Sequence, residues 1–158
     1  MDVEVVRSTR RRRTVEARQV DGRLRISIPA TMTSAEEARW VQLMTRRFER
    51  RAKAAPVDLA ERARMLAGQC RLPLPASIRW VDPQRARWGS CTVGTQAIRI
   101  STALAGFPRW VLDYVIVHEL AHLVEANHSP AFWTLVARYP LTERARGFLI
   151  AKGVEADE

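Results

Sequence analysis

Three histidines are the feature that most constrains this chain, because all of them lie within the eleven residues from His118 to His128. His118 and His122 are four positions apart, and residues with this spacing lie on one face of a helix, one turn apart. Glu119 follows the first of them, so the segment has the His-Glu-x-x-His pattern in which a helix supplies two zinc ligands and a general base. The apolar residues 115–117 favour a buried helix. The pattern therefore predicts a metal-dependent hydrolase that folds around this helix.

A third protein ligand must come from outside the helix, because catalytic zinc sites combine three protein ligands with one position for water. His128 lies six residues after His122, the separation found in the extended metzincin motif. Glu143 is the alternative, since it is placed like the glutamate that a later helix contributes in gluzincins. We expect His128 to be the ligand, because imidazole is a common zinc ligand and the chain has no further histidine.

Two differences separate this segment from an ordinary metzincin. Glu125 stands where metzincins have the glycine that lets the chain reverse, and no methionine follows Met65 to form a Met-turn. The reversal between the second and third histidines must therefore form in another way. Asn127 is a candidate for the bend, because asparagine tolerates the left-handed backbone conformation.

Glu119 is expected to be the general base. Bound zinc lowers the pKa of its water towards neutrality, so a nearby carboxylate can take a proton as that water attacks a carbonyl or phosphoryl group. The side chains of Asp113 and Glu125 could each accept a hydrogen bond from a ligand imidazole and fix its tautomer. Tyr114 lies one turn before His118, where it could either face the metal and stabilise an oxyanion or pack in the core.

The charge of the chain is strongly basic and unevenly distributed. Lys and Arg number 26 against 17 Asp and Glu, a formal net charge of +9 at pH 7. Residues 1–53 contain 14 basic and 7 acidic residues, and Arg10–Arg13 form an unbroken basic run. Such a surplus attracts polyanions, although a solvated, arginine-rich strand would show the same composition and no base-reading motif accompanies the charge. The basic N-terminal region is therefore a candidate contact for nucleic acid or another polyanion.

Length and cysteine content favour a single cytoplasmic domain. The 158 residues are enough for one core, and no apolar stretch approaches the roughly 18 residues of a membrane-spanning helix. The first residues lack the basic-then-apolar pattern of a secretory signal, and Cys70 and Cys91 are too few for a disulfide framework. We expect one domain over residues 1–158, with a basic sheet and helix in residues 1–53 and the catalytic half in residues 54–158.

Periodicity and turn signals predict an α+β fold. Residues 14–20 and 23–28 read as strands joined by a tight turn at Asp21-Gly22, and residues 3–8 read as a further strand of an N-terminal antiparallel sheet. Thr33 or Ser34 can cap the first helix, and Ser129 can cap a helix that opens with Pro130. The other expected elements are helices over residues 34–53, 57–70, 108–122, 130–139 and from 142 onwards, and a small second sheet formed by residues 78–81, 87–92 and 97–101.

A larger set of motifs resembles the YgjP-like metallopeptidase-type hydrolases, a predicted metal-dependent hydrolase family of the zincin tribe that is distantly related to SprT-like and WLM proteins. The motifs are Arg87-Trp88-Gly89-Ser90-Cys91, Pro108-Arg109-Trp110, Asp113-Tyr114-Val115, the histidine segment His118–Leu123, and Asn127-His128-Ser129 followed by Phe132-Trp133. The N-terminal basic strand, the Asp21-Gly22 turn and residues 26–29 also resemble the start of that family. The resemblance therefore covers most of the chain.

The resemblance implies a zincin-like fold with a zinc site at the matching positions. It assigns His118, His122 and His128 as ligands and Glu119 as the base. It also implies that residues 87–91 form a strand beside the cleft, which could hold a peptide by β-addition with Ser90 or Cys91 pointing towards the metal. Cys91 could also be an ordinary core residue or a redox-sensitive one. Trp110 and Trp133 are expected to be packing residues.

These observations favour a small zinc metallopeptidase that uses a zinc-bound water with Glu119 as general base. One alternative keeps the metal but changes the substrate, to give a nucleotide or phosphate-ester hydrolase in which the basic N-terminal sheet holds the phosphates. Another is a nucleic-acid-associated protease of the SprT-like kind. The substrate is a peptide in the first case and a nucleotide in the second, so turnover of peptides against nucleoside triphosphates separates the two.

Overall fold

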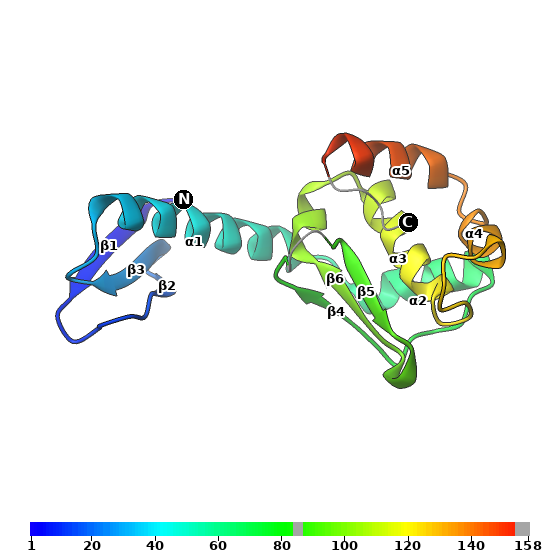
Figure 1. Cartoon of the computed structure of the whole chain (residues 1–158), viewed down its shortest axis with the longest axis horizontal. Coiled ribbons are helices and arrows are strands. Elements are labelled where there is room, and N and C mark those ends of the chain that lie inside the picture. Colours follow the sequence, from blue (N-terminus) through cyan, green and yellow to red (C-terminus); the bar gives the residue numbers. More distant parts are fainter. Residues whose placement is uncertain (84–86, 154–158) are drawn as a thin grey trace. The chain divides into compact units, whose positions relative to one another are not determined.

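The first fifty residues fold around the tight turn at Asp21-Gly22, where both residues have a positive φ, 49° and 77°. This conformation matches the twist of a two-residue hairpin, and it joins β2 (Glu16–Val20) to β3 (Arg23–Pro29) in antiparallel register. The hairpin predicted from the sequence is thus confirmed (Figure 1). The structure, a computed structural model, describes residues 1–83 and 87–153.

The remaining strand of this sheet, β1 (Val3–Ser8), pairs in parallel with β3, so the strand order is β1-β3-β2 and the sheet is mixed. The expectation of an antiparallel sheet was wrong for this pair. The reason lies in β3, whose Leu24, Ile26 and Ile28 are fully buried. Because it is the most apolar of the three strands, it takes the central position between the other two, and β1 then runs in the same direction as β3.

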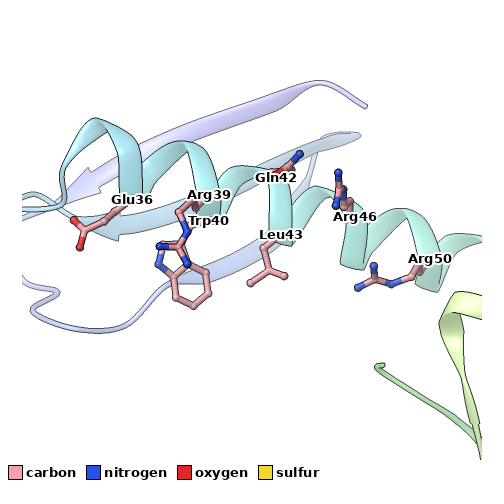
Figure 2. A pocket seen from close by; sticks show the side chains of 7 residues that line it. All are labelled: Glu36, Arg39, Trp40, Gln42, Leu43, Arg46 and Arg50. Carbon is pink, nitrogen blue, oxygen red and sulfur yellow. The ribbon is translucent and has the colours of Figure 1, made fainter. Parts of the chain in front are cut away.

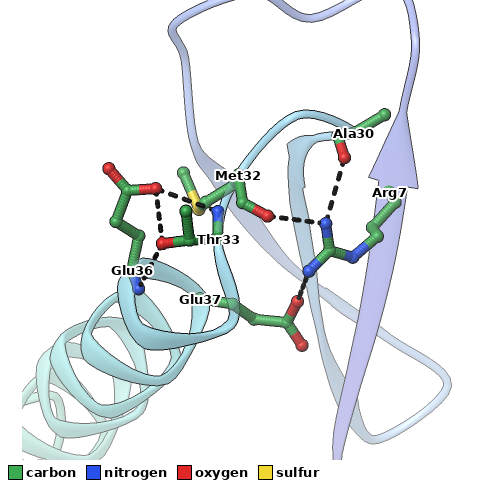
Figure 3. A network of polar contacts seen from close by, with 6 residues as sticks. All are labelled: Arg7, Ala30, Met32, Thr33, Glu36 and Glu37. Carbon is green, nitrogen blue, oxygen red and sulfur yellow. Dashed lines mark hydrogen bonds and ion pairs between the residues drawn. The ribbon is translucent and has the colours of Figure 1, made fainter.

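The helix α1 (Ser34–Ala54) begins with a capping box. The Thr33 hydroxyl accepts a hydrogen bond from the N–H of Glu36 at 3.3 Å, and the Glu36 carboxylate accepts one from the N–H of Thr33 at 2.9 Å (Figure 3). This reciprocal pair satisfies two backbone donors that a helix start leaves open. The same contact lowers the pKa of Glu36.

Arg7 joins β1 to the segment that leads into α1. Its guanidinium donates hydrogen bonds to the backbone carbonyls of Ala30 and Met32 at 3.0 and 2.7 Å, and it pairs with the Glu37 carboxylate (Figure 3). One face of α1 then packs on the sheet, where Met44 is buried together with the three apolar residues of β3.

The rest of the chain is built on a second three-stranded sheet with the order β4-β6-β5. The central strand β6 (Ala97–Ser101) pairs in parallel with β4 (Ser77–Val81) and antiparallel with β5 (Gly89–Thr92). This order leaves β5 at the edge of the sheet. The helical elements of this part are α2 (Leu59–Cys70), η1 (Val93–Thr95), η2 (Thr102–Gly106), α3 (Arg109–Ala121), α4 (Pro130–Val136) and α5 (Thr142–Ala151).

Helix α3 lies at the centre of this second part, between the sheet and the other helices (Figure 1). Ten of its residues are buried, among them Ile116 and Val117, which are fully buried. It packs against α2, α4, α5 and β5. Because α3 is surrounded by other elements, most of its residues are apolar, although it also carries His118 and Glu119.

The chain divides into two compact units, Met1–Arg50 and Arg51–Glu158, each with its own apolar core. The boundary falls within α1, close to the division at residue 53 expected from the charge, and the single-domain organisation stays a prediction. Among the described residues, no helix combines the length and apolarity that crossing a membrane requires. The α+β class predicted from the sequence is confirmed.

Candidate metal centre

Three histidines come together at the C-terminal end of α3. His118 lies in the last turn of this helix, His122 follows its final residue, and His128 lies in the loop before α4. One ring nitrogen from each lies within 4.8 Å of the other two, and within the described part of the chain this is the group of side chains suited to hold a metal ion. The Nε2 atoms of His118 and His128 are 3.1 Å apart.

The reversal of the chain after α3 uses ordinary backbone conformations. The N–H groups of Val124 and Glu125 both donate to the carbonyl of Ala121, at 3.0 and 2.9 Å, and the N–H of Ser129 donates to the carbonyl of Asn127 at 2.8 Å. Asn127 has no positive φ, so the expected left-handed bend at this residue was wrong. Glu125 likewise keeps a negative φ, which is why this chain needs no glycine at that position.

The backbone of Glu125 also orients His122. The Nδ1 atom of His122 lies 3.1 Å from the Glu125 carbonyl oxygen, which can only accept a hydrogen bond. Nδ1 therefore carries the proton, which leaves Nε2 unprotonated, the form in which an imidazole nitrogen binds a metal. Glu125 therefore does orient a candidate ligand, but through its backbone carbonyl and not through its side chain as expected.

His118 is held in the neutral form that a metal ligand requires. Burial, reinforced by His122, His128 and the positive charge of Arg146, lowers the pKa of His118 to about 3. A neutral imidazole offers a lone pair without first losing a proton, so metal binding at this residue does not compete with protonation near neutral pH.

Two aromatic residues of α4 enclose the three imidazoles. The ring of Phe132, which is fully buried, lies 4.9, 4.4 and 4.8 Å from the rings of His118, His122 and His128. Trp133 stacks on His128 with a centroid distance of 5.8 Å and an interplanar angle of 26°. Trp133 is a packing residue, as expected, but it packs on a candidate ligand.

Glu119 lies beside the three histidines and is only 5% exposed. Its carboxylate packs so closely on Gly89 of β5 that a Cβ atom at this glycine would lie 2.6 Å from Glu119 Oε1. Only glycine allows this approach, which accounts for the glycine of the Arg87–Cys91 motif. This contact could not be predicted from the sequence, because the two residues are thirty positions apart and lie on different elements.

A hollow of about 370 Å³ opens in front of these side chains. Its lining combines Glu119, the three histidines and Ala126 with residues of β5 and its flanks, namely Arg87, Gly89, Ser90, Cys91 and Val93. Burial raises the pKa of the Cys91 thiol, and the negative charge of Glu119 raises it further. The expected strand beside the cleft is therefore confirmed, although it begins at Gly89 and not at Arg87.

The donor set and its spacing fit a transition-metal ion. Two nitrogens that share one zinc ion at about 2.1 Å in tetrahedral geometry lie roughly 3.4 Å apart, close to the 3.1 Å between the Nε2 atoms of His118 and His128. Imidazole ligands suit zinc and related ions, whereas magnesium and calcium prefer oxygen. The three residues thus have the chemistry of a metal site.

Comparison with known proteins supports this interpretation. The model of the YgjP-like metallopeptidase domain matches residues 8–149. The chain belongs to the YgjP-like family. The comparison with curated proteins gave no match.

Two solved structures resemble the fold of this YgjP-like chain. Abylysin of Pyrococcus abyssi, described as a metallopeptidase zymogen, is 18% identical with a TM-score of 0.52, over 58% of this chain and 91% of its own. Jannalysin of Methanocaldococcus jannaschii, also described as a metallopeptidase zymogen, is 19% identical with a TM-score of 0.50, over 62% of this chain and 95% of its own. The likeness shows a shared minimal-metallopeptidase fold.

Some residues expected at the centre of this YgjP-like domain lie elsewhere. Asp113 forms a two-pronged ion pair with Arg62 of α2, at 2.5 and 2.7 Å, so it holds α2 to α3 and does not orient a histidine. The side chain of Glu143 is 83% exposed and pairs with Arg146 at 3.1 Å, outside the histidine cluster. The alternative in which Glu143 is the third ligand is thus not supported.

Tyr114 is buried one turn before His118, with its ring 6.0 Å away in an edge-on contact. Its hydroxyl is buried without a hydrogen-bond partner among the described residues, and burial raises the pKa of Tyr114 to about 12. The tyrosine is therefore a neutral core residue beside the histidines. It does not line the hollow.

Proposed function

We propose that this chain is a zinc-dependent peptidase in which His118, His122 and His128 hold the ion and Glu119 is the general base. The observation that carries the proposal is the hollow in which the three converging ring nitrogens and the buried carboxylate face an edge strand. Membership of a metallopeptidase domain family supports the same function. The two similar solved structures support the fold but give no information about the substrate of this chain.

The place of Glu119 in the hollow beside the histidines supports its role in proton transfer. A zinc ion held by the histidines would supply Lewis acidity, which polarises a scissile carbonyl and makes water a better nucleophile. Glu119 takes the proton of the attacking water on a carboxylate oxygen and passes it to the departing amine. Its burial against Gly89 restricts the orientation of the carboxylate, so the side chain needs little rearrangement when it accepts the proton.

Strand β5 is suited to bind the backbone of an extended peptide. It pairs with β6 along one side, so its other side presents backbone N–H and C=O groups at the edge of the sheet. A peptide added there would be held by main-chain hydrogen bonds beside Glu119. This arrangement favours unfolded or extended substrates over folded ones.

The replacement Glu119→Gln tests the assignment. Glutamine keeps the shape of the side chain and removes the base, so we expect peptide turnover to be lost while the bound zinc, measured by elemental analysis, stays at the wild-type level. His128→Ala should lower the zinc content itself. Unchanged turnover in Glu119→Gln would refute Glu119 as the base.

A second function, contact with a polyanion, is favoured by a hollow of about 440 Å³ along α1 (Figure 2). Arg39, Arg46 and Arg50 line it together with Trp40 and Leu43, and its one acidic lining residue is Glu36. None of these arginines forms an ion pair with a residue that the structure describes. Strands of nucleic acid bind to such surfaces through phosphates and through stacking on aromatic rings.

A further inference from the structure

A second hollow, of about 290 Å³, lies on the other face of strand β5. It shares Arg87 and residues 89–91 with the hollow in front of the histidines, so β5 forms a partition between the two. The pairing of β5 with β6 shows which side chains belong to each face. Cys91 pairs with the buried Ile98, whereas Ser90 pairs with Arg99, and adjacent strand residues point to opposite faces.

This second hollow is positively charged. Arg87 and Arg99 line it along with the hydroxyl groups of Ser90, Thr92 and Ser101, and no acidic side chain is among its described lining residues. Neither arginine makes a hydrogen bond or an ion pair with any residue in the described part of the chain.

The partial burial of Arg99 makes the absence of an acidic partner informative. Arg99 is partly buried, and the loss of water around a guanidinium costs free energy that a nearby anion can offset. The acidic residue next to the end of β4, Asp82, is already paired with Arg51 at 2.7 Å. No described residue beside Arg99 supplies a compensating negative charge, so an anion that enters the hollow would find this guanidinium unpaired.

We propose that this hollow binds an anionic group of the substrate, carried by the residue or group next to the bond that is cleaved. The proposal rests on the hydrolytic site of the proposed peptidase and names the charge of its substrate. A peptide that extends β5 alternates its side chains between the two faces, as β5 itself does. When one residue faces Glu119, its neighbour faces Arg99. A carboxylate or a phosphate in that position accepts two hydrogen bonds from the planar guanidinium.

The anionic group has two chemical sources, an acidic side chain of a peptide and the phosphates of a nucleotide. Binding is measured in the zinc-loaded Glu119→Gln protein, so that the result does not depend on turnover. One arm uses a labelled peptide with Glu on both sides of its centre and a matched peptide with Gln at those places. The other arm uses a nucleoside triphosphate and the corresponding nucleoside. Both arms are run at 150 mM salt, where the Debye length is about 8 Å and long-range attraction is screened.

Arg99→Gln is the test variant and Arg79→Gln is its matched control. Arg79 lies opposite Arg99 on β4, is exposed and does not line the hollow, so both variants lose one positive charge from neighbouring strands. We expect Arg99→Gln to weaken binding of the anionic probe about tenfold, which corresponds to about 1.4 kcal/mol, with little change in Arg79→Gln. Arg87→Gln, at an exposed position before β5, should act in the same direction as Arg99→Gln and does not depend on the integrity of the central strand.

Each result bears on the proposal. A selective loss in the peptide arm identifies an acidic peptide and supports the anion subsite. A selective loss in the nucleotide arm identifies a phosphate substrate, which also supports the anion subsite but counts against the proposed peptidase activity. Equal effects of Arg99→Gln and Arg79→Gln, or no preference for the anionic probe over its neutral partner, would overturn it. Turnover by the Glu119→Gln protein would instead count against the proposed catalytic base and leave the binding result standing.

Discussion

Gly89 and Glu119 constrain each other at the scale of single residues. A Cβ atom at Gly89 would lie 2.6 Å from the Glu119 carboxylate, so alanine there must displace the proposed base. A shift of about 1 Å in a catalytic group can cost on the order of 100-fold in rate. We expect Gly89→Ala to lower kcat by about this factor and to leave the zinc content unchanged, as measured by peptide turnover and elemental analysis.

Gly94 provides the control for this substitution. A Cβ atom at Gly94 would have no heavy atom within 4 Å, and this glycine lies in η1, which follows β5. Gly94→Ala should therefore keep wild-type turnover. Equal losses in both variants would show that the effect of Gly89→Ala does not come from its contact with Glu119.

The buried His118 makes the metal-free protein sensitive to acid. Its pKa of about 3 in the folded state is below the usual 6.5, so the unfolded state binds more protons between these two values and stability falls as the pH drops through this window. From pH 7 to pH 5 we expect the free energy of unfolding to decrease by about 2 kcal/mol. Urea unfolding of the metal-free protein at both pH values measures this loss, and His118→Gln should reduce it. A loss of the same size in His118→Gln would assign the effect to other groups.

The residues that could be predicted from the sequence are those whose partners are close along the chain. Spacing alone identified the histidines, because a helix and a short loop join all three. The contact of Gly89 with Glu119 and the packing of Phe132 on the imidazoles could not be predicted, because they depend on how β5 and α4 pack against α3. Asp113 was assigned wrongly for a similar reason, since its partner Arg62 lies on a separate helix.

At the scale of elements, α4 acts as a support for the metal centre. Its Phe132 contacts all three imidazoles, so replacement by leucine leaves a gap beside each candidate ligand. Residues that orient metal ligands typically contribute about 10- to 100-fold in metal affinity. We expect Phe132→Leu to weaken zinc binding by a factor in this range, measured by competition with a chelator of known affinity.

Phe148 of α5 offers the same chemical change away from the histidines. It packs edge-on against Phe107 and Trp110, at 5.2 and 5.6 Å, and has no ring contact with a histidine. Phe148→Leu should lower thermal stability with little effect on zinc affinity. A similar fall in zinc affinity in the two variants would attribute the effect to general loosening of the fold.

Local signals predicted the starts of two helices, whereas α4 ends at Val136 and not at the expected residue 139. Long-range pairing limited the prediction of the sheets. Ser129 was predicted as a cap and Thr33 was one of two candidates beside Ser34, and both Thr33 and Ser129 accept the expected hydrogen bond at a helix start. The direction of β1 was not identified, because it depends on which strand takes the centre of the sheet. That choice follows from the burial of β3 as a whole and not from any residue of β1.

At the scale of the whole molecule, ion pairs divide the arginines of the first fifty residues into two classes. Arg18, Arg23 and Arg25 on the strands pair with Glu16, Asp2 and Glu4. The arginines that line the hollow along α1 have no such partner among the described residues. Pairing neutralises these strand arginines locally, so the charge available to a polyanion lies along α1 and in Arg10, Arg12 and Arg13 of the loop before β2, which form no ion pair among the described residues.

Single-stranded nucleic acid is the probe that tests this distribution. Arg39 to Arg50 spans about 16 Å along the helix, enough for several phosphates. Each phosphate contact on a single strand contributes about 0.7 to the slope of log affinity against log salt. Replacing Arg39, Arg46 and Arg50 by glutamine should therefore weaken binding of a labelled oligothymidylate and reduce this slope by about 2. Replacing the paired Arg18, Arg23 and Arg25 changes the net charge equally and should have a much smaller effect. Equal slopes in the two triple variants would mean that only the overall charge attracts the strand and that the hollow along α1 has no part in it.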